Sequence, residues 1–318
     1  MNHNKNKLLI VAATPESAGV GGVTVHVERL LQYLDKKGFA YELFDYKIAP
    51  LLSILNKIRK SEVVHLHICN PYFMFLLAVI CRAFRKKYLL TLHGKYTETE
   101  QKPWLLIKYA IKKATVPIVL NQISYKTCIS INPQTIIFPA FIPPQIEEAL
   151  ETDVKSIVEK IHSEGKKVAV TYGYDDFLDA AGREVYGIGF LIPIFNNNKE
   201  YSLIVVNPTG SYEKKYSEKY PNIYFINHPL SLFELLKVSD VFVRNTSKDG
   251  DSLSVKEALY LHKKVICTDV VERPKGVCLY SYSDLDSFMS CLNANNENDI
   301  VEVASCEEKI LDLYRKMI

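Results

Sequence analysis

The sequence of 318 residues has no hydrophobic run long enough to cross a membrane. The longest uninterrupted run, Tyr72 to Cys81, has ten residues, about half of the ~20 that a helix needs to span a bilayer. We also expect no secretory leader, because Met1 to Lys7 is polar and the apolar segment Leu8 to Ala13 is short and typical of a strand. These absences predict a cytoplasmic protein.

Seven cysteines are scattered along the chain, and no two of them form a C-x-x-C pair. This odd, dispersed set predicts reduced thiols and argues against a zinc site. Two histidines, His65 and His67, fall on one face of a predicted strand. They could bind a metal or only pack near the strand end, but no third ligand stands at a recognisable spacing. We therefore expect no metal ion and no cofactor.

Charge is divided unevenly between the two halves of the chain, and the length itself predicts two domains. Residues 1–150 carry 19 Lys and Arg against 10 Asp and Glu, a balance of +9. Residues 151–318 carry 20 against 26, a balance of −6. A basic first half could face anionic lipid, a phosphorylated acceptor or nucleic acid.

Short apolar runs recur along the chain, separated by helical or loop segments. After residues 8–13 they are 41–44, 63–67, 88–92, 118–120 and 136–138 in the first half, and 168–171, 203–206, 223–226, 241–243 and 265–267 in the second. A proline-rich break, Pro139 to Pro144, lies between the two series. The pattern predicts an α/β protein with two doubly wound domains facing a cleft.

A glycine-rich loop follows the first predicted strand. It contains Gly19, Gly21 and Gly22, and a segment with helical spacing comes after it. Strand, glycine loop and helix can cradle a phosphate, because glycine lets the backbone approach closely and a helix start attracts negative charge. The spacing differs from the G-x-G-x-x-G of a nicotinamide site. Taken only as a loop pattern, these glycines indicate a tight turn and a phosphate contact equally well.

The most informative stretch runs from Asp240 to Leu261 and predicts a strand, a polar loop and a helix. Ser254 and Glu257 have the spacing of a capping box, which marks a helix start. Such a loop opens at the carboxyl edge of a parallel sheet, where α/β proteins bind ligands. Taken alone, Glu257 could be only a cap residue, and Asp249 with Gly250 only a turn.

The same stretch resembles the donor site of a known family. Asp249, seven further residues and Glu257-Ala-Leu, preceded by Arg244 and followed by Val265 to Asp269, resemble the signature of retaining GT-B glycosyltransferases, nearest to family 4. The family usually has Glu where this chain has Asp249, whose reach is one methylene shorter. The resemblance implies that Glu257 holds the nucleotide ribose and that Asp249 is a catalytic residue that contacts the transferred sugar.

Other segments extend this resemblance. Gly21 and Gly22 match a loop that lies near the donor diphosphate, and Thr91 to Gly94 resembles a strand end that puts His93 at the cleft, with an uncertain catalytic role. The family's Lys after the first strand of the second domain is missing here. The resemblance leaves the diphosphate to a helix start or to arginines, and the candidates are Ser252, Leu253, Ser254, Arg183 and Arg244.

The resemblance implies an acceptor-binding Rossmann-like domain at 1–143, a nucleotide-sugar-binding domain at 144–300, and a helix at 301–318 that could pack back on the first. The expected activity is transfer of a sugar, of hexosyltransferase type, from a donor such as a UDP- or GDP-sugar to a hydroxyl of a glycan or lipid-linked acceptor in polysaccharide biosynthesis. Peripheral contact with an anionic membrane is open through the basic amphipathic segment Gln101 to Lys113. No nucleic-acid partner is expected. Two alternatives stay open: a catalytically silent binding subunit of the same fold, and an NAD(P)-dependent oxidoreductase.

Overall fold

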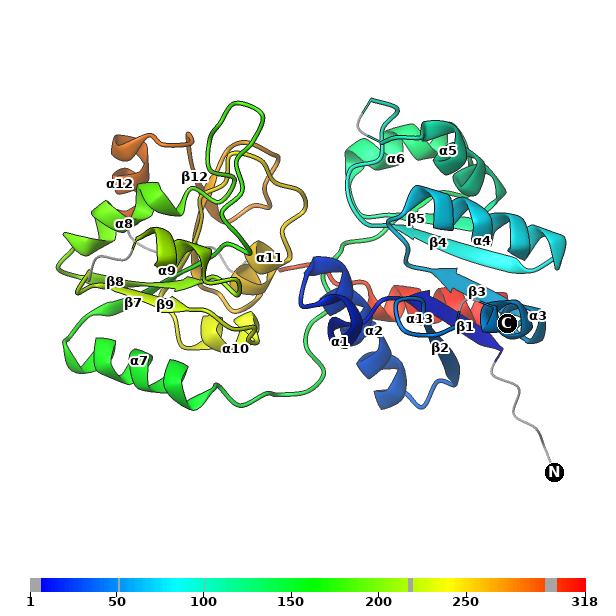
Figure 1. Ribbon diagram of the computed structural model, residues 1–318, viewed down its shortest axis with the longest axis horizontal. Coiled ribbons are helices and arrows are strands. Elements are labelled where there is room, and N and C mark those ends of the chain that lie inside the picture. The colour runs from blue at the N-terminus through cyan, green and yellow to red at the C-terminus, as the bar shows by residue number, and fades with distance from the viewer. Residues whose placement is uncertain (1–6, 51, 100, 217–219, 295–301) are drawn as a thin grey trace. The chain divides into compact units, whose positions relative to one another are not determined.

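The computed structural model describes residues 7–50, 52–99, 101–216, 220–294 and 302–318. The chain forms two compact units (Figure 1). Unit 1 comprises residues 1–146 and 304–318, and unit 2 comprises residues 147–303. The chain therefore leaves unit 1 after Ile146 and returns to it at Ala304.

Unit 1 is built on six parallel strands in the order β2-β1-β3-β4-β5-β6. The strands are β1 Leu8–Ala12, β2 Tyr41–Asp45, β3 Val63–Leu66, β4 Lys87–Leu92, β5 Val116–Val119 and β6 Ile136–Ile137. The apolar runs predicted all six. Strands covered on both faces are continuously apolar, and β1, β3 and β4 have almost no exposed residue.

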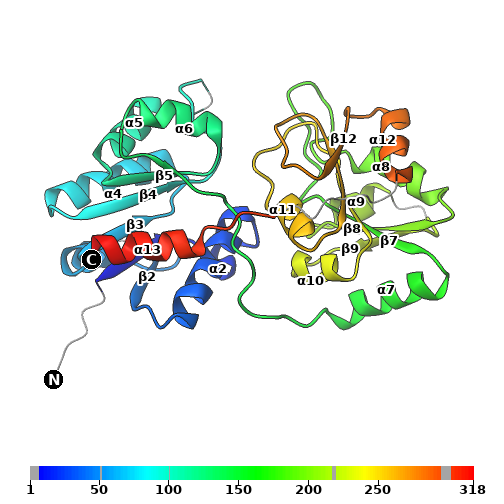
Figure 2. The same cartoon turned by 180° about the vertical axis from the view of Figure 1, so that it is seen from behind.

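Helices cover both faces of this sheet. They are α1 Pro15–Ala18, α2 Gly22–Lys36, α3 Ser53–Lys60, α4 Pro71–Ala83, α5 Trp104–Lys113, α6 Gln122–Ile129 and α13 Glu307–Met317. Alternate residues of β1 divide between two cores. Leu8 and Ile10 pack in one cluster with residues of α2 and α13, and Leu9 and Val11 pack in the other with residues of α3, α4 and α5. Figure 2 shows α13 beside α2 on its face of the sheet.

Unit 2 has a second sheet of six parallel strands, in the order β12-β11-β10-β7-β8-β9. The strands are β7 Lys167–Tyr172, β8 Tyr201–Val206, β9 Ile223–Ile226, β10 Val241–Arg244, β11 Lys264–Thr268 and β12 Val277–Tyr280. The sequence predicted the first five. It did not predict β12, although Val277 to Tyr280 is a short apolar run, because four residues at a partly buried sheet edge give only a weak signal.

The helices of unit 2 are α7 Thr152–Ser163, α8 Ile188–Asn196, α9 Ser211–Lys215, α10 Leu232–Lys237, α11 Leu253–Tyr260 and α12 Leu285–Asn293. They again form a core on each face of the sheet. Val168 and Phe242 pack in one cluster with residues of α7, α10 and α11. Ala169 and Val243 pack in the other with residues of α8 and α12. The two units thus repeat one architecture.

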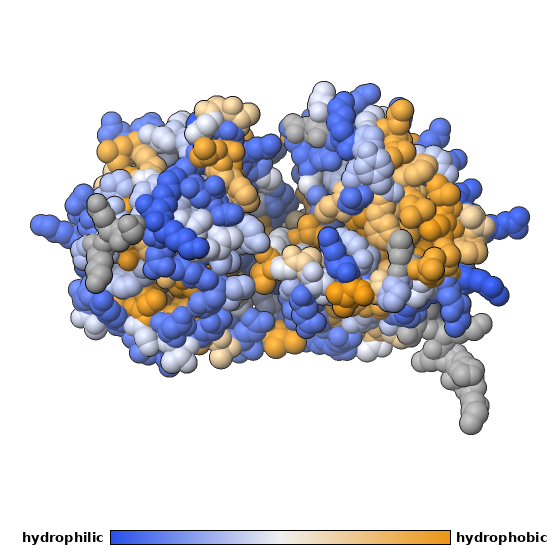
Figure 3. Space-filling view, in the orientation of Figure 1, coloured by the Kyte–Doolittle hydropathy of each residue, from blue (hydrophilic) through white to orange (hydrophobic). Residues whose placement is uncertain are grey.

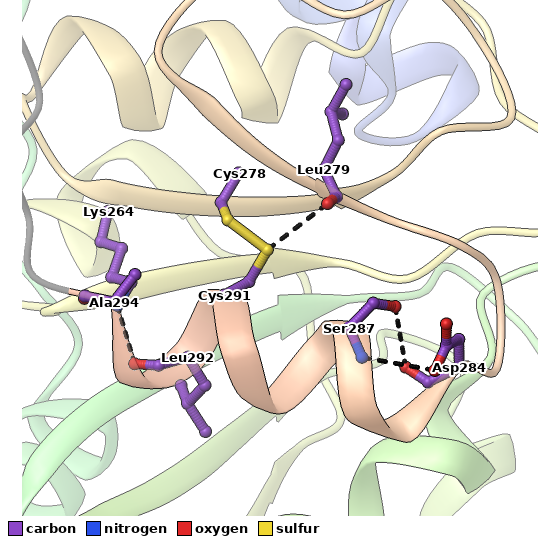
Figure 4. The surroundings of a disulfide bond; sticks show 8 residues. All are labelled: Lys264, Cys278, Leu279, Asp284, Ser287, Cys291, Leu292 and Ala294. Atoms are coloured by element: carbon purple, nitrogen blue, oxygen red, sulfur yellow. Dashed lines mark hydrogen bonds between the residues drawn. A yellow bond between two sulfur atoms is a disulfide. The ribbon is translucent and has the colours of Figure 1, made fainter.

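A disulfide joins β12 to α12, and it corrects the expectation that all thiols are reduced. Cys278 and Cys291 are 13 residues apart and form the bond (Figure 4). The remaining five cysteines, Cys69, Cys81, Cys128, Cys267 and Cys306, lie outside this disulfide. The sequence missed the pair because its spacing fits no motif. The two residues meet only because α12 packs against the edge strand.

None of the helices in the described ranges combines the length and apolar composition that crossing a membrane requires. The longest apolar run of the sequence lies within α4, which has 13 residues. Its side chains divide between two environments. Met74 and Leu77 are fully buried, whereas Tyr72 and Leu76 are exposed. The run therefore forms one helix that packs on the sheet and shows an apolar outer face.

Candidate functional site

The strand order reverses once in each sheet, and the predicted site residues gather near these points. In unit 2, β7 lies between β8 and β10, so consecutive connections run to opposite sides of it. In unit 1 the corresponding neighbours are β1 and β3. Doubly wound proteins bind ligands outside the carboxyl ends of the strands at such switch points. Arg244 ends β10, and His67 follows the end of β3.

Arg244 is the last residue of β10 and is nearly enclosed by its neighbours. Its Nη1 donates a hydrogen bond to the carbonyl of Tyr172, which ends the adjacent strand β7 (3.3 Å). Its guanidinium also lies 5.2 Å from the ring centre of Tyr186. The side chain is 11% exposed. The switch point of unit 2 therefore carries a fixed positive charge.

Asp249 binds this arginine together with a second one, Arg273. Its carboxylate accepts hydrogen bonds from Nε and Nη2 of Arg244 (3.1 and 3.0 Å) and from Nη1 of Arg273 (2.7 Å). Burial raises the pKa of Asp249, but the charge and hydrogen bonds of Arg244, and then those of Arg273, outweigh it and lower the pKa to about 2. The cluster of these three residues, the Arg–Asp–Arg cluster, thus keeps a net charge of +1 at neutral pH.

Arg273 was not among the site residues predicted from the sequence. It lies in the loop between β11 and β12, and it also donates to the carbonyl of Thr268 at 3.2 Å. The sequence carried a signal that could have found Arg273. The apolar runs of β10 and β11 are consecutive in the chain, which predicts neighbouring strands. The loops after neighbouring parallel strands open on the same edge of a sheet, so the loop after β11 lies near the loop after β10.

Helix α11 begins beside the Arg–Asp–Arg cluster, earlier than the capping-box pattern predicted. Its N-cap is Ser252 and its first residue is Leu253, so Ser254 is the second helical residue and Glu257 the fifth. The capping box between Ser254 and Glu257 is therefore wrong. Ser254 instead shares a hydrogen bond with Ser252 (Oγ to Oγ, 3.0 Å). The S-x-x-E spacing predicts the N-cap at Ser254, whereas the N-cap is Ser252, so the polar loop before the helix is two residues shorter than predicted.

Glu257 is a buried acidic residue on α11, only 4% exposed. One helical turn separates it from Leu253, so both lie on the same face of the helix. Its contact with a nucleotide ribose remains a prediction.

Arg183 lies in the loop between β7 and α8, outside the Arg–Asp–Arg cluster. Its Nε donates to Asp179 at 2.8 Å, and its guanidinium lies 5.6 Å from the ring centre of Tyr282. The side chain is half exposed. The next residue, Glu184, accepts a hydrogen bond from the backbone N–H of Gly189 (2.9 Å), in the first turn of α8. A protein carboxylate therefore occupies this helix start, where an anion would otherwise bind.

Gly21 and Gly22 stand at the start of α2 in unit 1, as the N-cap and the first helical residue. The Thr24 hydroxyl accepts a hydrogen bond from the N–H of Gly21 (3.0 Å). A Cβ built on either glycine would meet no atom within 4 Å, and neither glycine has a positive φ. Packing therefore does not require glycine here, which is consistent with close approach of a ligand.

His93 follows β4 and belongs to a cluster of histidines at the carboxyl edge of the unit 1 sheet. Its Nε2 lies 2.9 Å from Nδ1 of His67, which follows β3. His26 of α2 packs against both rings, with ring centres 5.1 Å from His93 and 5.7 Å from His67. His65 of β3 lies behind them, 3.3 Å from His67. The structure thus supplies the third and fourth neighbours that the spacing of His65 and His67 could not reveal.

Burial governs the protonation of these rings. Desolvation, and then the charge of His26, lower the pKa of His65 to about 3. Desolvation, and then neighbouring histidines, hold the pKa values of His67 and His93 well below the usual 6.5. Imidazoles in this setting are neutral at physiological pH, which is the form that accepts protons and binds metals.

The chain is similar to several solved GT-B glycosyltransferases over nearly its whole length. HepE of Anabaena, solved with UDP-glucose, has a TM-score of 0.70 at 10% identity over 97% of this chain and 99% of HepE. A glycosyltransferase of Rickettsia africae (TM-score 0.64, 13% identity) covers 99% of both chains. Sucrose-phosphate synthase of Thermosynechococcus elongatus (0.64, 12%) covers 98% of this chain and 99% of its own. These similarities confirm the predicted GT-B fold.

Neither a protein-family model nor a curated protein sequence matches the chain. At identities of 10–13% the similarity lies in the arrangement of strands and helices. It shows the fold and leaves the activity to be argued from the residues themselves.

Proposed function

We propose that the protein is a retaining glycosyltransferase that moves a hexosyl group from a nucleotide-sugar to an acceptor hydroxyl. The observation that carries this proposal is the Arg–Asp–Arg cluster, a net positive group at the switch point of the second sheet of a GT-B fold. Breaking the donor's sugar–phosphate bond leaves negative charge on a diphosphate. Preorganised positive charge beside such a leaving group is usually the largest single contribution to catalysis.

In this proposal, different residues of unit 2 bind different parts of the donor. Arg244 and Arg273 bind the diphosphate, and the free backbone N–H groups at Ser252, Leu253 and Ser254 add the positive end of a helix dipole. Glu257, on the same helix, binds the ribose hydroxyls. Arg183, half exposed, is a further candidate for the diphosphate.

Asp249 acts on the sugar only if a carboxylate oxygen remains available to it. Each of its oxygens already accepts two hydrogen bonds, Oδ2 from Nε of Arg244 and Nη1 of Arg273, and Oδ1 from Nη2 of Arg244 and the backbone N–H of Gly250. These four donors fill the acceptor sites of a carboxylate. We therefore assign Asp249 the task of holding both guanidiniums in place, and its contact with the sugar requires a sugar hydroxyl to displace one of the four donors. In a retaining enzyme of this type the acceptor attacks from the face that the diphosphate leaves, and the leaving phosphate takes the acceptor's proton.

Unit 1 is proposed to bind the acceptor, with His93 at its ligand edge, and the loop of Gly21 and Gly22 is proposed to bind the donor diphosphate, as the family resemblance implies. The acceptor class is a glycan or lipid-linked saccharide. A lipid-linked substrate would agree with the surface of this unit, where hydrophobic area gathers over α4 (Figure 3). The exposed apolar residues of α3, α4, α5 and their ends are Leu52, Leu55, Tyr72, Leu76, Val79, Phe84 and Leu105.

Exposed basic residues accompany this apolar surface and favour an anionic membrane. They are Arg82, Arg85, Lys108, Lys112 and Lys113. Lys and Arg near an anionic membrane contribute about 1 kcal/mol each, and exposed Leu and Phe add burial in the headgroup region. We expect the protein to sediment with phosphatidylglycerol vesicles, less so at high salt, and not with phosphatidylcholine vesicles. Equal binding to both would contradict the electrostatic part of the proposal.

A thermal-shift screen tests the donor site. A ligand that binds the folded state at a hundredfold excess over its Kd stabilises it by about 2.7 kcal/mol. We expect UDP or GDP and their sugars to raise Tm, and Glu257→Gln to abolish the rise while the ligand-free protein still melts cooperatively. The matched control is Glu159→Gln, a solvent-exposed glutamate on α7, which should leave the rise intact.

The outcomes separate the alternatives. A rise with NAD(P) alone would indicate an oxidoreductase and contradict the proposal. A rise with UDP or GDP, without release of UDP or GDP from any donor in the presence of glycan and lipid-linked acceptors, would favour a silent binding subunit. If transfer occurs, the anomeric configuration of the product, read by NMR, tests retention.

A further inference from the structure

Three histidines from three separate elements converge at the carboxyl edge of the unit 1 sheet. His26 comes from the second turn of α2, His67 follows β3 and His93 follows β4. One ring nitrogen from each lies within 4.8 Å of the other two. His26 and His67 are buried and His93 is half-buried. The three rings form a compact group of nitrogen ligands with one partly open side.

The hydrogen bonds around the three rings determine which nitrogen faces the centre. His26 donates Nδ1–H to the carbonyl of Ala140 (2.8 Å), so its electron pair is on Nε2. His67 turns Nε2 toward Nδ1 of His65 at 3.3 Å, and in the tautomer that carries its proton on Nε2 the electron pair of His67 lies on Nδ1. Metal-binding histidines are typically oriented in this way, by a hydrogen bond from the nitrogen that does not bind the ion.

Two further hydrogen bonds fix the position of His65, the ring behind the three histidines. His65 is hydrogen-bonded through Nε2 to Thr91 at 2.7 Å and through Nδ1 to the hydroxyl of Tyr314 on α13. Both partners are buried. His65 is therefore held from two sides, and it in turn holds His67. The group is a built arrangement rather than a chance meeting of surface side chains.

We propose that His26, His67 and His93 bind a divalent transition-metal ion of the zinc class. Neutral imidazole suits zinc, copper and nickel, and three protein ligands with one open position form the donor set of catalytic zinc. Zn–N bonds of about 2.0–2.1 Å place tetrahedral nitrogens about 3.3 Å apart. Nδ1 of His67 and Nε2 of His93 are 2.9 Å apart, a few tenths of an ångström below that spacing. The nitrogen of His26 lies within 4.8 Å of both, so it moves inward by at most about 1.5 Å to reach the same spacing.

Binding needs only a change of tautomer at His93. In the present geometry one proton lies between His67 and His93. His93 carries it on Nε2 when His67 has its electron pair on Nδ1. The ion takes the place of that proton, which moves to Nδ1 of His93, and all three rings stay neutral. The bound ion then adds a charge of +2 at the switch point of unit 1.

The open position faces the side of His93, the most accessible of the three rings. It takes a water molecule or an oxygen of a ligand. If the proposed transfer reaction is correct, that oxygen belongs to the acceptor, and this assignment rests on the proposed function. The metal site itself does not, because its ligands are all in unit 1 and the donor cluster is in unit 2.

Metal titration of the whole chain, produced without a histidine tag and freed of metal with a chelator, tests the proposal. We expect one Zn2+ per chain by competition with a chromophoric chelator, and one Co2+ with the visible spectrum of a tetrahedral site. His93→Gln, on the half-buried side, should weaken both by at least about tenfold. His67→Gln should do the same, and circular dichroism checks that it folds.

The control is His228→Gln. His228 contacts Glu151 and Asp153 in a second, exposed group of possible ligands in unit 2, and its loss should leave the tight site unchanged. Binding below one ion per chain, or binding unaffected by His93→Gln, would overturn the proposal. So would a tight site lost in His228→Gln. Thermal shifts with UDP or GDP on the same variants report the donor site separately, so either proposal can fail alone.

Discussion

The two units place opposite chemistry at the same point of the same architecture. At the switch point of unit 2, buried charges are paired in the Arg–Asp–Arg cluster. At that of unit 1, buried histidines are held neutral by desolvation and contact one another. Burying a charge is costly unless it is paired and hydrogen-bonded. At the edge of unit 2 a counter-charge meets that requirement, and at the edge of unit 1 the buried side chains are uncharged.

This difference assigns different ligands to the two edges. The paired cluster retains a net +1 that suits a diphosphate, whereas the neutral rings suit a cation. A shared fold therefore predicts where a ligand lies in each unit, and the residues after the strands decide its charge. Each variant below changes one of the two edges and is compared with a matched reference.

The largest expected effect is on the unit 2 edge, with Asp249→Ala. Removing one partner of a buried ion pair leaves uncompensated charge and costs about 3–5 kcal/mol, here on two arginines whose side chains are at most 11% exposed. Urea unfolding measures the loss. Glu159→Ala, which breaks an exposed i,i+4 pair with Lys155, should leave the unfolding midpoint nearly unchanged. Similar effects of both variants would show that the cluster is not a buried charge network.

An acid titration of stability gives the next effect. The pKa of Asp249 falls from an ordinary 3.8 to about 2 in the fold. A lowered pKa stabilises the folded state above the unfolded-state value, and this contribution disappears as the pH falls from about 4 to about 2. It amounts to about 2 kcal/mol. Because other carboxyls titrate in the same range, the measurement is the difference between wild type and Asp249→Asn across that window. Parallel curves would contradict the assigned pKa.

The smallest effect on stability is expected in the glycine loop of unit 1. Gly22→Ala places its methyl group in open space on the first residue of α2, so stability should stay constant or rise by up to about 1 kcal/mol. The reference in unit 2 is Gly187, before α8, where φ is 52° and a Cβ would collide with Asn245. Gly187→Ala should lose about 1–3 kcal/mol. If Gly22→Ala keeps its Tm but weakens phosphate-containing ligands, the loop contacts them. Unchanged binding would make it an ordinary turn.

Most of the framework could be predicted because buried parallel strands are continuously apolar. Short apolar runs marked all six strands of unit 1, although Glu42 interrupts β2, and five strands of unit 2. β12 was missed although Val277 to Tyr280 is apolar, because a run of four residues at a partly buried sheet edge is a weak signal. The start of α11 was misplaced because a capping-box spacing is short and recurs by chance.

The site could be predicted only where its residues are consecutive. Arg244, Asp249 and Glu257 stand in one strand–loop–helix segment, and a family signature covers that segment. Arg273 was missed because it comes 24 residues after its partner Asp249. The disulfide between Cys278 and Cys291 was missed for the same reason, since neither residue type nor spacing forms a local pattern.

The sequence by itself determined the class of this protein, two doubly wound α/β units with a polar strand-to-helix loop in each. Hydrophobic periodicity is local, and it specifies strands and helices wherever both faces of a sheet are covered. The tertiary structure decided which polar residues meet. His26 and His67 are 41 positions apart in the chain, and they become neighbours because parallel strands bring every loop of one sheet edge together. Burial then decided their charge, by desolvating the histidines of unit 1 and by pairing the arginines of unit 2.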